Sequence, residues 1–500
     1  METGRSSGQQ NNNQRPSRPA RMPQQGTSNA APRRPAQQGA PRTGAPGRGA
    51  PKSAAPKRPA PTPQRSQQAP RKSPEVDNAA QGAAKKTPLK KERKPFSWAD
   101  LPLVGWLSSR KRTILENERK QDEIPENLVR VRGGIDRPML VIILLLLCYG
   151  SVMVFSSSYA YALSDMGDSY YFIRRQILFV ILGLVAMVFV AHIDYKHVQR
   201  LTPLYFLICL AMMVAVLAVG ISEGDAKRWL NLGFTTVQPS EFMKLGLVLM
   251  LAWYYHKADR FVKTKLFWRS SVFGTFLPMV IVGVVCLLII LENHFSGTII
   301  LFLIGMLVIF AAGGKWFWFL LGVGGFGSVV AFLIFATDYA SKRIDIWLNP
   351  QNYSTQGEVW QTLQGLYAIG SGGILGVGLG NSTQKHLFVS QPQNDFIYSI
   401  ICEELGLVGA VLVIALFLAF VWRGIKIAQN TPDTFSRLTV IGIVSKVGIQ
   451  AFLNIAVVTG TIPNTGITLP FFSYGGSSLT ILLAEMGILL GISRYSYQQK

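Results

Sequence analysis

A pair of opposite charges stands at the start of a long apolar run, in the segment TTVQPSEFMKLGLVLML. Glu241 in the first turn of a helix complements the helix dipole, whereas Lys244 lies near the positive end and is unfavourable there without a partner. The two side chains share one helical face and can pair. The pair either neutralises the helix for entry into a bilayer or places charge in a polar cavity. We favour the cavity, because intramembrane ionisable residues usually serve function.

A single carboxylate, Asp395, directly precedes another apolar run in SQPQNDFIYSIICEELG. At a membrane edge, beside a long loop, desolvation raises the pKa of a carboxyl group toward the range of a general base. An aspartate before a helix is also a good N-cap, and the spacing leaves both interpretations open. The same predicted helix carries Glu403 and Glu404 further along.

A third segment, TGTIPNTGITLPFFSYGGSS, joins the last two apolar runs. It is rich in Gly, Pro, Ser and Thr and has no net charge, which indicates irregular backbone dipping into the membrane. Such backbone is tolerated only where protein buries it or where it lines a cavity. Its last residues could present amide N–H groups to an anion, although the segment by itself favours a simple tight turn: Ser473, Tyr474, Gly475, Gly476 and Ser477.

The histidines and cysteines predict no metal site and no disulfide framework. His192, His197 and His256 fall on the opposite side of the predicted membrane from His294 and His386, which are themselves isolated. The four cysteines lie inside or close to apolar runs, with spacings that suit no metal cage.

The elements that position these residues are helices that cross a membrane. A spanning helix needs about 20 mostly apolar residues, and the chain, 49% hydrophobic overall, concentrates such residues after position 137. We therefore predict an all-α integral membrane protein of about ten transmembrane helices. The predicted spans are 138–157, 176–192, 203–221, 240–256, 271–291, 297–312, 316–336, 397–422, 438–460 and 478–493.

The charges of the connections predict the orientation of these helices. Lys and Arg are more frequent in one alternate set of short loops, which the positive-inside rule places in the cytoplasm. Both termini are then cytoplasmic, and the long loop between helices 7 and 8, residues 337–396, is extracytoplasmic. A loop of this length is usually functional.

The N-terminal quarter is predicted to be a cytoplasmic tail. Residues 1–137 hold 28 Lys and Arg against 11 Asp and Glu, so +17 of the net charge of +23 lies there. Residues 1–94 are too poor in large apolar side chains to fold alone, and such charge beside a membrane is attracted to anionic lipid rather than requiring nucleic acid. Residues 95–137 form a juxtamembrane segment, in which 95–112 is either an interfacial helix or a linker.

Taken together, PSEFMKL, the NDF…EELG block and GITLPFFSYGGSS resemble the SEDS family, which comprises FtsW, RodA and SpoVE. ENHFSGT at 292–298, RIDIWLNP at 343–350 and AIGSGGILGVGLG at 368–380 also match family segments. The resemblance covers 138–497, which we take as one membrane domain. GITLPF is more similar to the division and sporulation members than to the elongation member.

The resemblance implies a peptidoglycan glycosyltransferase that polymerises lipid II outside the bacterial cytoplasmic membrane and releases undecaprenyl diphosphate. The family's catalytic aspartate maps onto Asp395, its helix-four pair onto Glu241 and Lys244, and a loop arginine onto Arg343. A diphosphate leaving group needs cations, which Lys244, Arg343, Lys342 and a Mg²⁺ or Mn²⁺ ion can supply. No organic cofactor is expected.

The resemblance also implies partners: a class B penicillin-binding protein (a transpeptidase) and other proteins of the division septum. Two departures stand out, since Asn394 replaces a usual Thr or Ser, and Asn293 with His294 replaces Pro-Asp or Pro-His. Two other functions remain open, a lipid II flippase and a non-catalytic scaffold. The sequence does not decide between division, sporulation and elongation, nor does it give the tail's partner or the oligomeric state.

Overall fold

The computed structural model describes residues 128–499, apart from 224–225, 232, 234–235, 265, 337 and 354–358. The predicted tail (1–94), the predicted interfacial helix (95–112) and most of the juxtamembrane segment lie outside the described residues. The predictions made for them therefore stay predictions.

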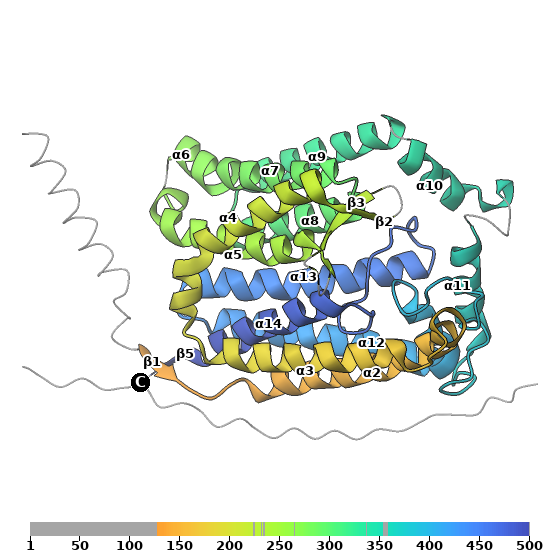
Figure 1. Ribbon diagram of the computed structural model, residues 1–500. Helices are drawn as coiled ribbons and strands as arrows, with labels where there is room; N and C mark the ends of the chain where they lie inside the picture. Colours follow the sequence, from red (N-terminus) through yellow and green to blue (C-terminus); the bar gives the residue numbers. More distant parts are fainter. Residues whose placement is uncertain are drawn as a thin grey trace, which may run out of the picture. The chain divides into compact units, whose positions relative to one another are not determined.

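Each of the ten predicted spans is a helix, so the predicted all-α membrane fold is confirmed (Figure 1). Seven of these helices are long and apolar enough to cross a membrane, α8 and residues 316–332 of α9 form shorter apolar helices, and α5 carries Glu241 and Lys244. The helices are α2 (Arg137–Met166), α3 (Tyr171–His192), α4 (Tyr195–Val219), α5 (Pro239–Val262), α6 (Phe267–Ser271) continuing through the π-helix η2 (Val272–Phe276) into α7 (Leu277–Leu291), α8 (Phe295–Ala311), α9 (Trp316–Ala336), α12 (Ile397–Gln429), α13 (Thr434–Val458) and α14 (Gly476–Ser493).

Two small sheets, which the sequence did not predict, join the helix ends. Strand β1 (Leu128–Arg132) pairs antiparallel with β5 (Tyr495–Gln499), so both described ends of the domain lie at the same end of the helices, as an even number of spans requires. Strands β2 (Ile221–Glu223), β3 (Ala226–Asn231) and β4 (Thr236–Val237) connect α4 to α5 at the opposite end. The strands have two to six residues each, and so short a stretch between long apolar runs gives only a weak strand signal.

The helices α13 and α14 form the centre of the domain. Their most apolar windows are 61% and 67% buried, against 17% for α3, whose outer face is left for lipid. Glycines let the neighbouring helices approach closely. A Cβ at Gly442 would collide with Val248 of α5, and a Cβ at Gly424 would collide with Val444 of α13. Close approach through small residues is how membrane helices gain packing energy where lipid is as apolar as the side chains.

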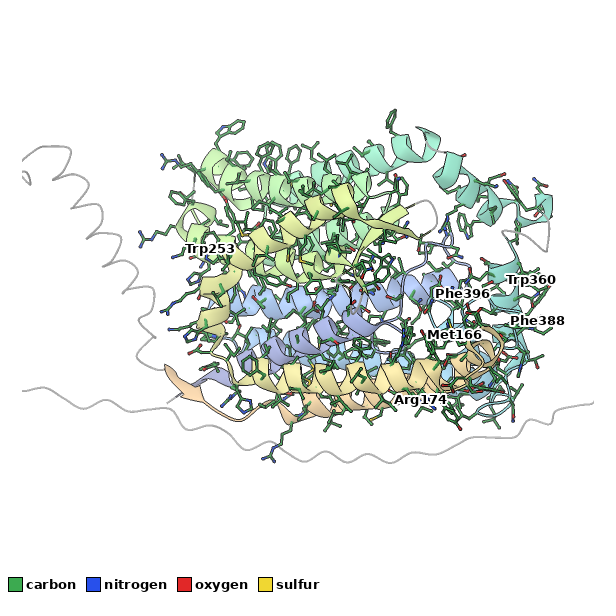
Figure 2. All side chains as sticks on the ribbon, viewed as in Figure 1. Met166, Arg174, Trp253, Trp360, Phe388 and Phe396 are labelled. Carbon is green, nitrogen blue, oxygen red and sulfur yellow. The ribbon has the colours of Figure 1, made fainter. Side chains whose placement is uncertain are left out.

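The described part of the long loop 337–396 contains two more helices, α10 (Asp338–Leu348) and α11 (Trp360–Ser371), with the short 3-10 helix η3 (Pro350–Asn352) between them. They lie at the end of the bundle opposite β1 and β5, which we call the loop end (Figure 1). We call the end with β1 and β5 the terminal end. Side chains of the loop and of the start of α12, among them Trp360, Phe388 and Phe396, gather at the loop end, whereas Trp253 lies near the terminal end (Figure 2).

The glycine-rich stretch that follows α11 docks against a break in α12. At Gly406 the backbone of α12 is non-helical (φ 64°, ψ −161°). The carbonyl of Glu403 accepts from the N–H of Val377 at 3.0 Å, and the N–H of Leu407 donates to the carbonyl of Gly373 at 2.9 Å. The glycines of this stretch therefore let the backbone bend and approach α12 closely.

We predict that Gly406→Ala destabilises the protein by about 2 kcal/mol or more. The backbone angles of Gly406 are essentially reserved for glycine, and a Cβ there would meet the N of Gly376 at 2.4 Å and the carbonyl oxygen of Ile374 at 2.5 Å. Thermal unfolding of the purified protein in detergent measures the effect. Gly370→Ala is the matched control, because a Cβ on this residue of α11 meets nothing within 4 Å. Equal melting temperatures for the two variants would contradict the prediction.

Candidate active site

Asp395 lies at the loop end, directly before α12. The helix begins at Ile397 with Phe396 at the N-cap and no side-chain cap, so the interpretation of Asp395 as a capping residue is wrong. Burial raises the pKa of the Asp395 carboxyl to about 6, although hydrogen bonds from its own N–H and that of Phe396, and the nearby charge of Arg343, act in the opposite direction. A carboxylate with this pKa is ionised at neutral pH and is a competent general base.

Two neighbouring segments hold the backbone around Asp395. The side-chain amide of Asn454 on α13 donates to the carbonyl of Asp395 at 2.7 Å and to the carbonyl of Ile467 at 2.6 Å. The N–H of Tyr474 donates to the carbonyl of Gln393 at 2.8 Å. The connection between α13 and α14 (459–475) is thereby fixed against the loop that carries Asp395.

Cationic side chains on α10 face the same connection. Arg343 donates through Nη1 to the carbonyl of Asn464 at 2.6 Å and interacts electrostatically with Asp395. Trp347, one turn further on, donates through Nε1 to the carbonyl of Gly460 at 2.8 Å. Between α10, α11 and this connection lies a cavity of about 400 Å³, lined by Lys342, Arg343, Ile346, Trp347, Pro350, Val359, Gln361, Thr362, Leu363, Leu366, Gly460, Ile462 and Asn464.

The predicted pair on α5 is formed. Lys244 Nζ lies 2.6 Å from Glu241 Oε1, and the two side chains are 5% and 14% exposed. Lys244 also donates to Gln450 Oε1 at 3.3 Å, and the Gln450 amide donates to the carbonyl and the hydroxyl oxygen of Thr468, both at 3.1 Å. The pair is thus tied to the same α13–α14 connection that holds Asp395.

A second buried ion pair lies beside the first, and sequence reasoning missed it. Lys446 on α13 and Glu485 on α14 are 2.6 Å apart and almost fully buried. Both interact electrostatically with Glu241 and Lys244. The signal was present, because each residue is a charge within a predicted span. A cavity of about 30 Å³, large enough for a water molecule, adjoins the pairs and is lined by Glu241, Lys446, Val447, Gln450, Thr468, Leu469, Pro470, Phe471, Ser473, Ser478, Leu479 and Leu482.

The two charged centres, Asp395 with Arg343 and the buried pairs, lie close together on one face of α13. Gln450, which contacts Lys244, and Asn454, which contacts the backbone of Asp395, are one helical turn apart, or about 6 Å along the axis. The structure therefore brings together the predicted residues Asp395, Arg343, Glu241 and Lys244. A base, several cations and a polar cavity can together serve a reaction in which an anionic group leaves.

The SYGGSS residues take other places. Ser473 donates its N–H to the carbonyl of Leu469, and its hydroxyl oxygen accepts from the N–H of Leu469 at 2.7 Å. The ring of Tyr474 packs edge-on against Phe172, with centroids 4.9 Å apart. Gly476 begins α14, and Ser477 donates to the carbonyl of Thr236 at 3.5 Å. The amides of Ser473 and Tyr474 are used within the protein, which leaves the N-cap residue Gly475 and the first turn of α14 to meet an anion, and the predicted anion contact stays a prediction.

The turn between α7 and α8 supplies a further carboxylate that sequence reasoning missed. Glu292 is 2% exposed, and burial raises the pKa of its carboxyl to about 8. Burial lowers the pKa of His294 to about 3, so this imidazole is neutral. Ser296 donates to the carbonyl of Thr465 at 2.5 Å, which joins the turn to the α13–α14 connection. In the sequence, ENHFSGT matches a family segment and differs from it at Asn293 and His294, and neither feature marks Glu292 as a buried carboxylate.

Comparisons with known proteins agree with the geometry. The family profile of FtsW, RodA and SpoVE, described as "Cell cycle protein", matches residues 137–498. Stage V sporulation protein E of Bacillus subtilis is 40% identical over 366 residues, which cover 72% of this chain and 97% of that protein. A probable peptidoglycan glycosyltransferase FtsW of Geobacter metallireducens is 38% identical over 365 residues, covering 72% of this chain and 95% of that protein.

Solved structures show the same fold. A chain from a peptidoglycan synthase complex, described for its structural coordination of polymerization and crosslinking, matches with a TM-score of 0.59 at 25% identity, over 72% of this chain and 98% of that one. The rod shape determining protein RodA of Thermus thermophilus matches with a TM-score of 0.53 at 25% identity, over 72% and 97%. The resemblance stated from the sequence is confirmed, including the greater likeness to division and sporulation members.

We predict that Lys244→Met alone lowers the stability of the protein by about 3 kcal/mol, because it leaves the carboxylate of Glu241 buried without its nearest cation. The double variant Glu241→Gln, Lys244→Met should recover at least half of that loss, since neither charge then remains. Thermal unfolding in detergent measures both.

The control for this cycle is Lys263→Met, which breaks the surface pair of Lys263 with Asp259 near the end of the same helix. That lysine side chain is 69% exposed, and such pairs contribute at most about 1 kcal/mol. A single variant Lys244→Met as stable as the parent protein would mean that Lys446 alone neutralises Glu241.

Proposed function

Because the chain belongs to the FtsW, RodA and SpoVE family of cell cycle proteins, we propose that its membrane domain is a peptidoglycan glycosyltransferase that polymerises lipid II at the outer face of the bacterial cytoplasmic membrane. The observation that carries this assignment is Asp395, a carboxylate with a raised pKa held beside Arg343 at the loop end. The relatives that are 40% and 38% identical to this chain favour a role in septal or spore wall synthesis.

The proposed reaction joins two sugars and releases a lipid diphosphate. The acceptor's 4-hydroxyl attacks C1 of the donor MurNAc, the bond from C1 to the diphosphate oxygen breaks, and the hydroxyl proton moves to the carboxylate of Asp395. Only the ionised carboxylate can accept that proton. With a pKa of about 6, activity should therefore fall as the pH drops below 6.

We assign the leaving diphosphate to Arg343 and Lys342. Both line the 400 Å³ cavity at the loop end, and guanidinium and ammonium groups stabilise the charge that develops on a leaving phosphate. Lys244 is closed into its pair with Glu241, so we place these two beneath the reacting groups, as part of the polar cavity that adjoins them. A lipid-linked donor suits a site at this depth, because its chain can stay in the bilayer.

Among the described residues, no group of three or more His, Cys, Asp or Glu side chains gathers in a way that would hold a metal ion. Mg²⁺ at such sites is bound by one or two carboxylates together with substrate phosphates and water. A Mg²⁺ or Mn²⁺ ion would therefore arrive with the diphosphate, and no step of the proposed reaction is derived through it.

We further propose a transpeptidase of the class B penicillin-binding type as partner, at the division septum with other septal proteins. The structural likeness to a chain from a complex that coordinates polymerization and crosslinking supports this partner. The basic tail, residues 1–94, is proposed to contact anionic lipid at the cytoplasmic face.

We predict that Asp395→Asn abolishes lipid II polymerisation while the protein stays folded. The variant keeps the size of the side chain and removes the base, and loss of a general base costs roughly 100- to 10,000-fold in rate. Polymerisation by the purified protein on lipid II in detergent or liposomes measures it, and melting temperature and partner binding report folding.

The matched control is Asp168→Asn, another aspartate outside the spans at the same end, which forms an exposed pair with Arg174. It should polymerise lipid II at a near-normal rate. A folded Asp395→Asn protein with near-normal activity would exclude Asp395 as the base. A parent protein that moves lipid II across liposomes without polymerising it would instead support a flippase.

We predict that the loop end faces outward. A cysteine at Ser341, an exposed residue of α10, should react with an impermeant maleimide in intact cells, whereas a cysteine at Asn430, exposed between α12 and α13, should react only after lysis. Cys148, the exposed native thiol, is first changed to serine, and the other three thiols are buried. The opposite labelling pattern would reverse the proposed orientation.

A further inference from the structure

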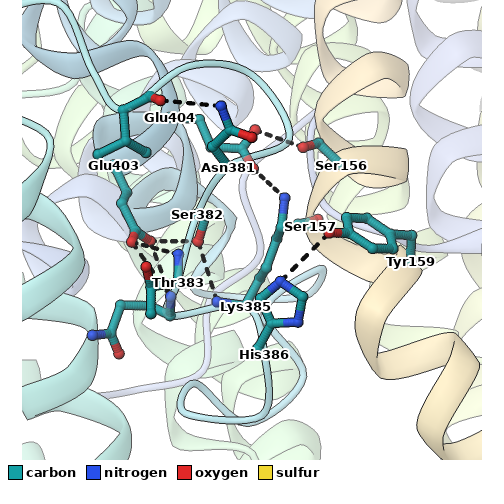
Figure 3. Close-up of polar contacts among 12 residues, drawn as sticks. Ser156, Ser157, Tyr159, Asn381, Ser382, Thr383, Lys385, His386, Glu403 and Glu404 are labelled. Carbon is teal, nitrogen blue, oxygen red and sulfur yellow. Dashed lines mark hydrogen bonds and ion pairs between the residues drawn. The ribbon is translucent and has the colours of Figure 1, made fainter.

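Two consecutive carboxylates lie two turns into α12 from Asp395 and take no part in the proposed reaction. Glu403 and Glu404 are 1% and 0% exposed. Figure 3 shows them at the centre of a polar cluster that joins α12, the loop 378–396 and α2. The cluster is separate from the ion pairs of Lys244 and Lys446.

Glu404 binds a buried lysine of the loop and a serine of α2. Lys385 Nζ, on a residue that is 0% exposed, lies 2.6 Å from Glu404 Oε1. Ser156 donates to Glu404 Oε2 at 2.5 Å. The same ammonium group lies 4.6 Å from the ring centroid of Tyr159 on α2, and His386 Nε2 is 3.4 Å from the Tyr159 hydroxyl. Three separate segments therefore converge on one ion pair.

Glu403 holds the turn that precedes Lys385. Its carboxylate accepts from the hydroxyl of Ser382, from the N–H of Thr383 at 2.8 Å and from the N–H of Gln384 at 3.3 Å. These are charge-assisted hydrogen bonds to a fixed backbone turn, which are stronger than bonds between neutral groups. The turn cannot shift without breaking them.

These contacts make one unit of the loop and the first part of α12. Residues 397–405 end at the break at Gly406, so the regular helical hydrogen bonding that would tie their orientation to the rest of α12 is interrupted there. Asp395 stands directly before this short helix, and Glu403 and Glu404 stand at its end. The loop is hydrogen-bonded to Glu403 at residues 382–384 and continues into the start of the same helix after Asp395, so loop and helix form a closed ring of contacts. Through Lys385 and Ser156, the ring is attached to α2.

A contribution to the stability of the fold does not by itself explain the buried ion pair of Lys385 with Glu404. Removing charges from water is costly, and replacing a buried ion pair by apolar groups of similar volume is often neutral or stabilising. What the pair supplies, and an apolar contact does not, is a short bond of fixed length and direction between α12, the loop and α2.

We propose that Lys385 and Glu404 are positioning residues for the reaction, which fix the orientation of the short helix 397–405 and hence the place of the Asp395 carboxylate relative to Arg343. This inference rests on the proposed function, because it assumes that Asp395 is the base. A displacement of about 1 Å at a reacting group can cost about 100-fold in rate. Loss of the ion pair between Lys385 and Glu404 should therefore lower turnover rather than weaken substrate binding.

The test is the charge-free double variant Lys385→Met, Glu404→Gln in the full-length protein, which leaves neither charge buried alone. We expect a melting temperature close to that of the parent, a kcat for lipid II polymerisation lowered about 10- to 100-fold, and a KM within about threefold. The acid limb of the pH profile should also move below pH 6, because a loosened Asp395 becomes better hydrated and its pKa falls toward the ordinary value. A purely structural pair would leave that limb in place.

The control removes another ion pair of the same length, although a partly exposed one, at the terminal end. Arg423 and Asp136 are 2.6 Å apart, and Arg423→Met with Asp136→Asn keeps a capping side chain before α2. Its kcat and pH profile should equal those of the parent. Ser156→Ala is the milder variant for the case that the double variant fails to fold: it removes one hydrogen bond from Glu404 and should lower kcat about threefold to tenfold.

The outcomes separate the two proposals. If the parent protein polymerises lipid II, Asp395→Asn does not, and the folded Lys385 and Glu404 variant has the kcat and acid limb of the parent, the positioning role is excluded and the proposed function stands. An unfolded double variant together with an unchanged Ser156→Ala enzyme also excludes it. A parent protein without polymerisation activity overturns the proposed function itself.

Discussion

The exchange of backbone hydrogen bonds between the broken helix α12 and the glycine-rich segment after α11 is the constraint on which the loop end depends. In a bilayer, a freed carbonyl or N–H finds no water and must be paired by protein. The carbonyls of Glu403 and Glu404, released by the break at Gly406, accept from Val377 and Gly378. The break therefore exists only together with the docked segment, and the short helix beside Asp395 is defined by both.

Pairing of charge is the same constraint applied to side chains. The buried cations Lys244, Lys446 and Lys385 each have a carboxylate at 2.6 Å. Two side-chain amides of α13, those of Gln450 and Asn454, donate hydrogen bonds to carbonyls of the α13–α14 connection and so tie it to α13. In this way an apolar bundle of helices can contain a polar site while each of these three buried lysines keeps a carboxylate partner.

Sequence reasoning succeeded where all the residues that form a feature lie within one helix. Each of the ten spans is a run of apolar residues, and the pair of Glu241 with Lys244 lies three residues apart on one helix. It failed where the signal was shared between distant segments: Lys446 and Glu485 are 39 positions apart, and Lys385 and Glu404 are 19 apart. The placement of Asp395 beside Arg343 came from the family resemblance, because no local pattern relates residues of α10 to the start of α12. The break at Gly406 depends on a docked partner that periodicity does not reveal.

Asp395 and Arg343 are also coupled electrostatically, so the pKa of the Asp395 carboxyl depends on the charge at Arg343. The pKa of Asp395 is the result of burial, which raises it, and of the Arg343 charge, which lowers it. In the proposed reaction, a diphosphate bound to Arg343 would neutralise part of that charge, so the lowering effect on the pKa of Asp395 would weaken and the pKa would rise further. The carboxylate would then be a stronger base when the proposed donor is in place. In the empty site it remains ionised at neutral pH and ready to receive the acceptor's proton. In the proposed site, the distance between α10 and the start of α12 would therefore set both the binding of the leaving group and the strength of the base.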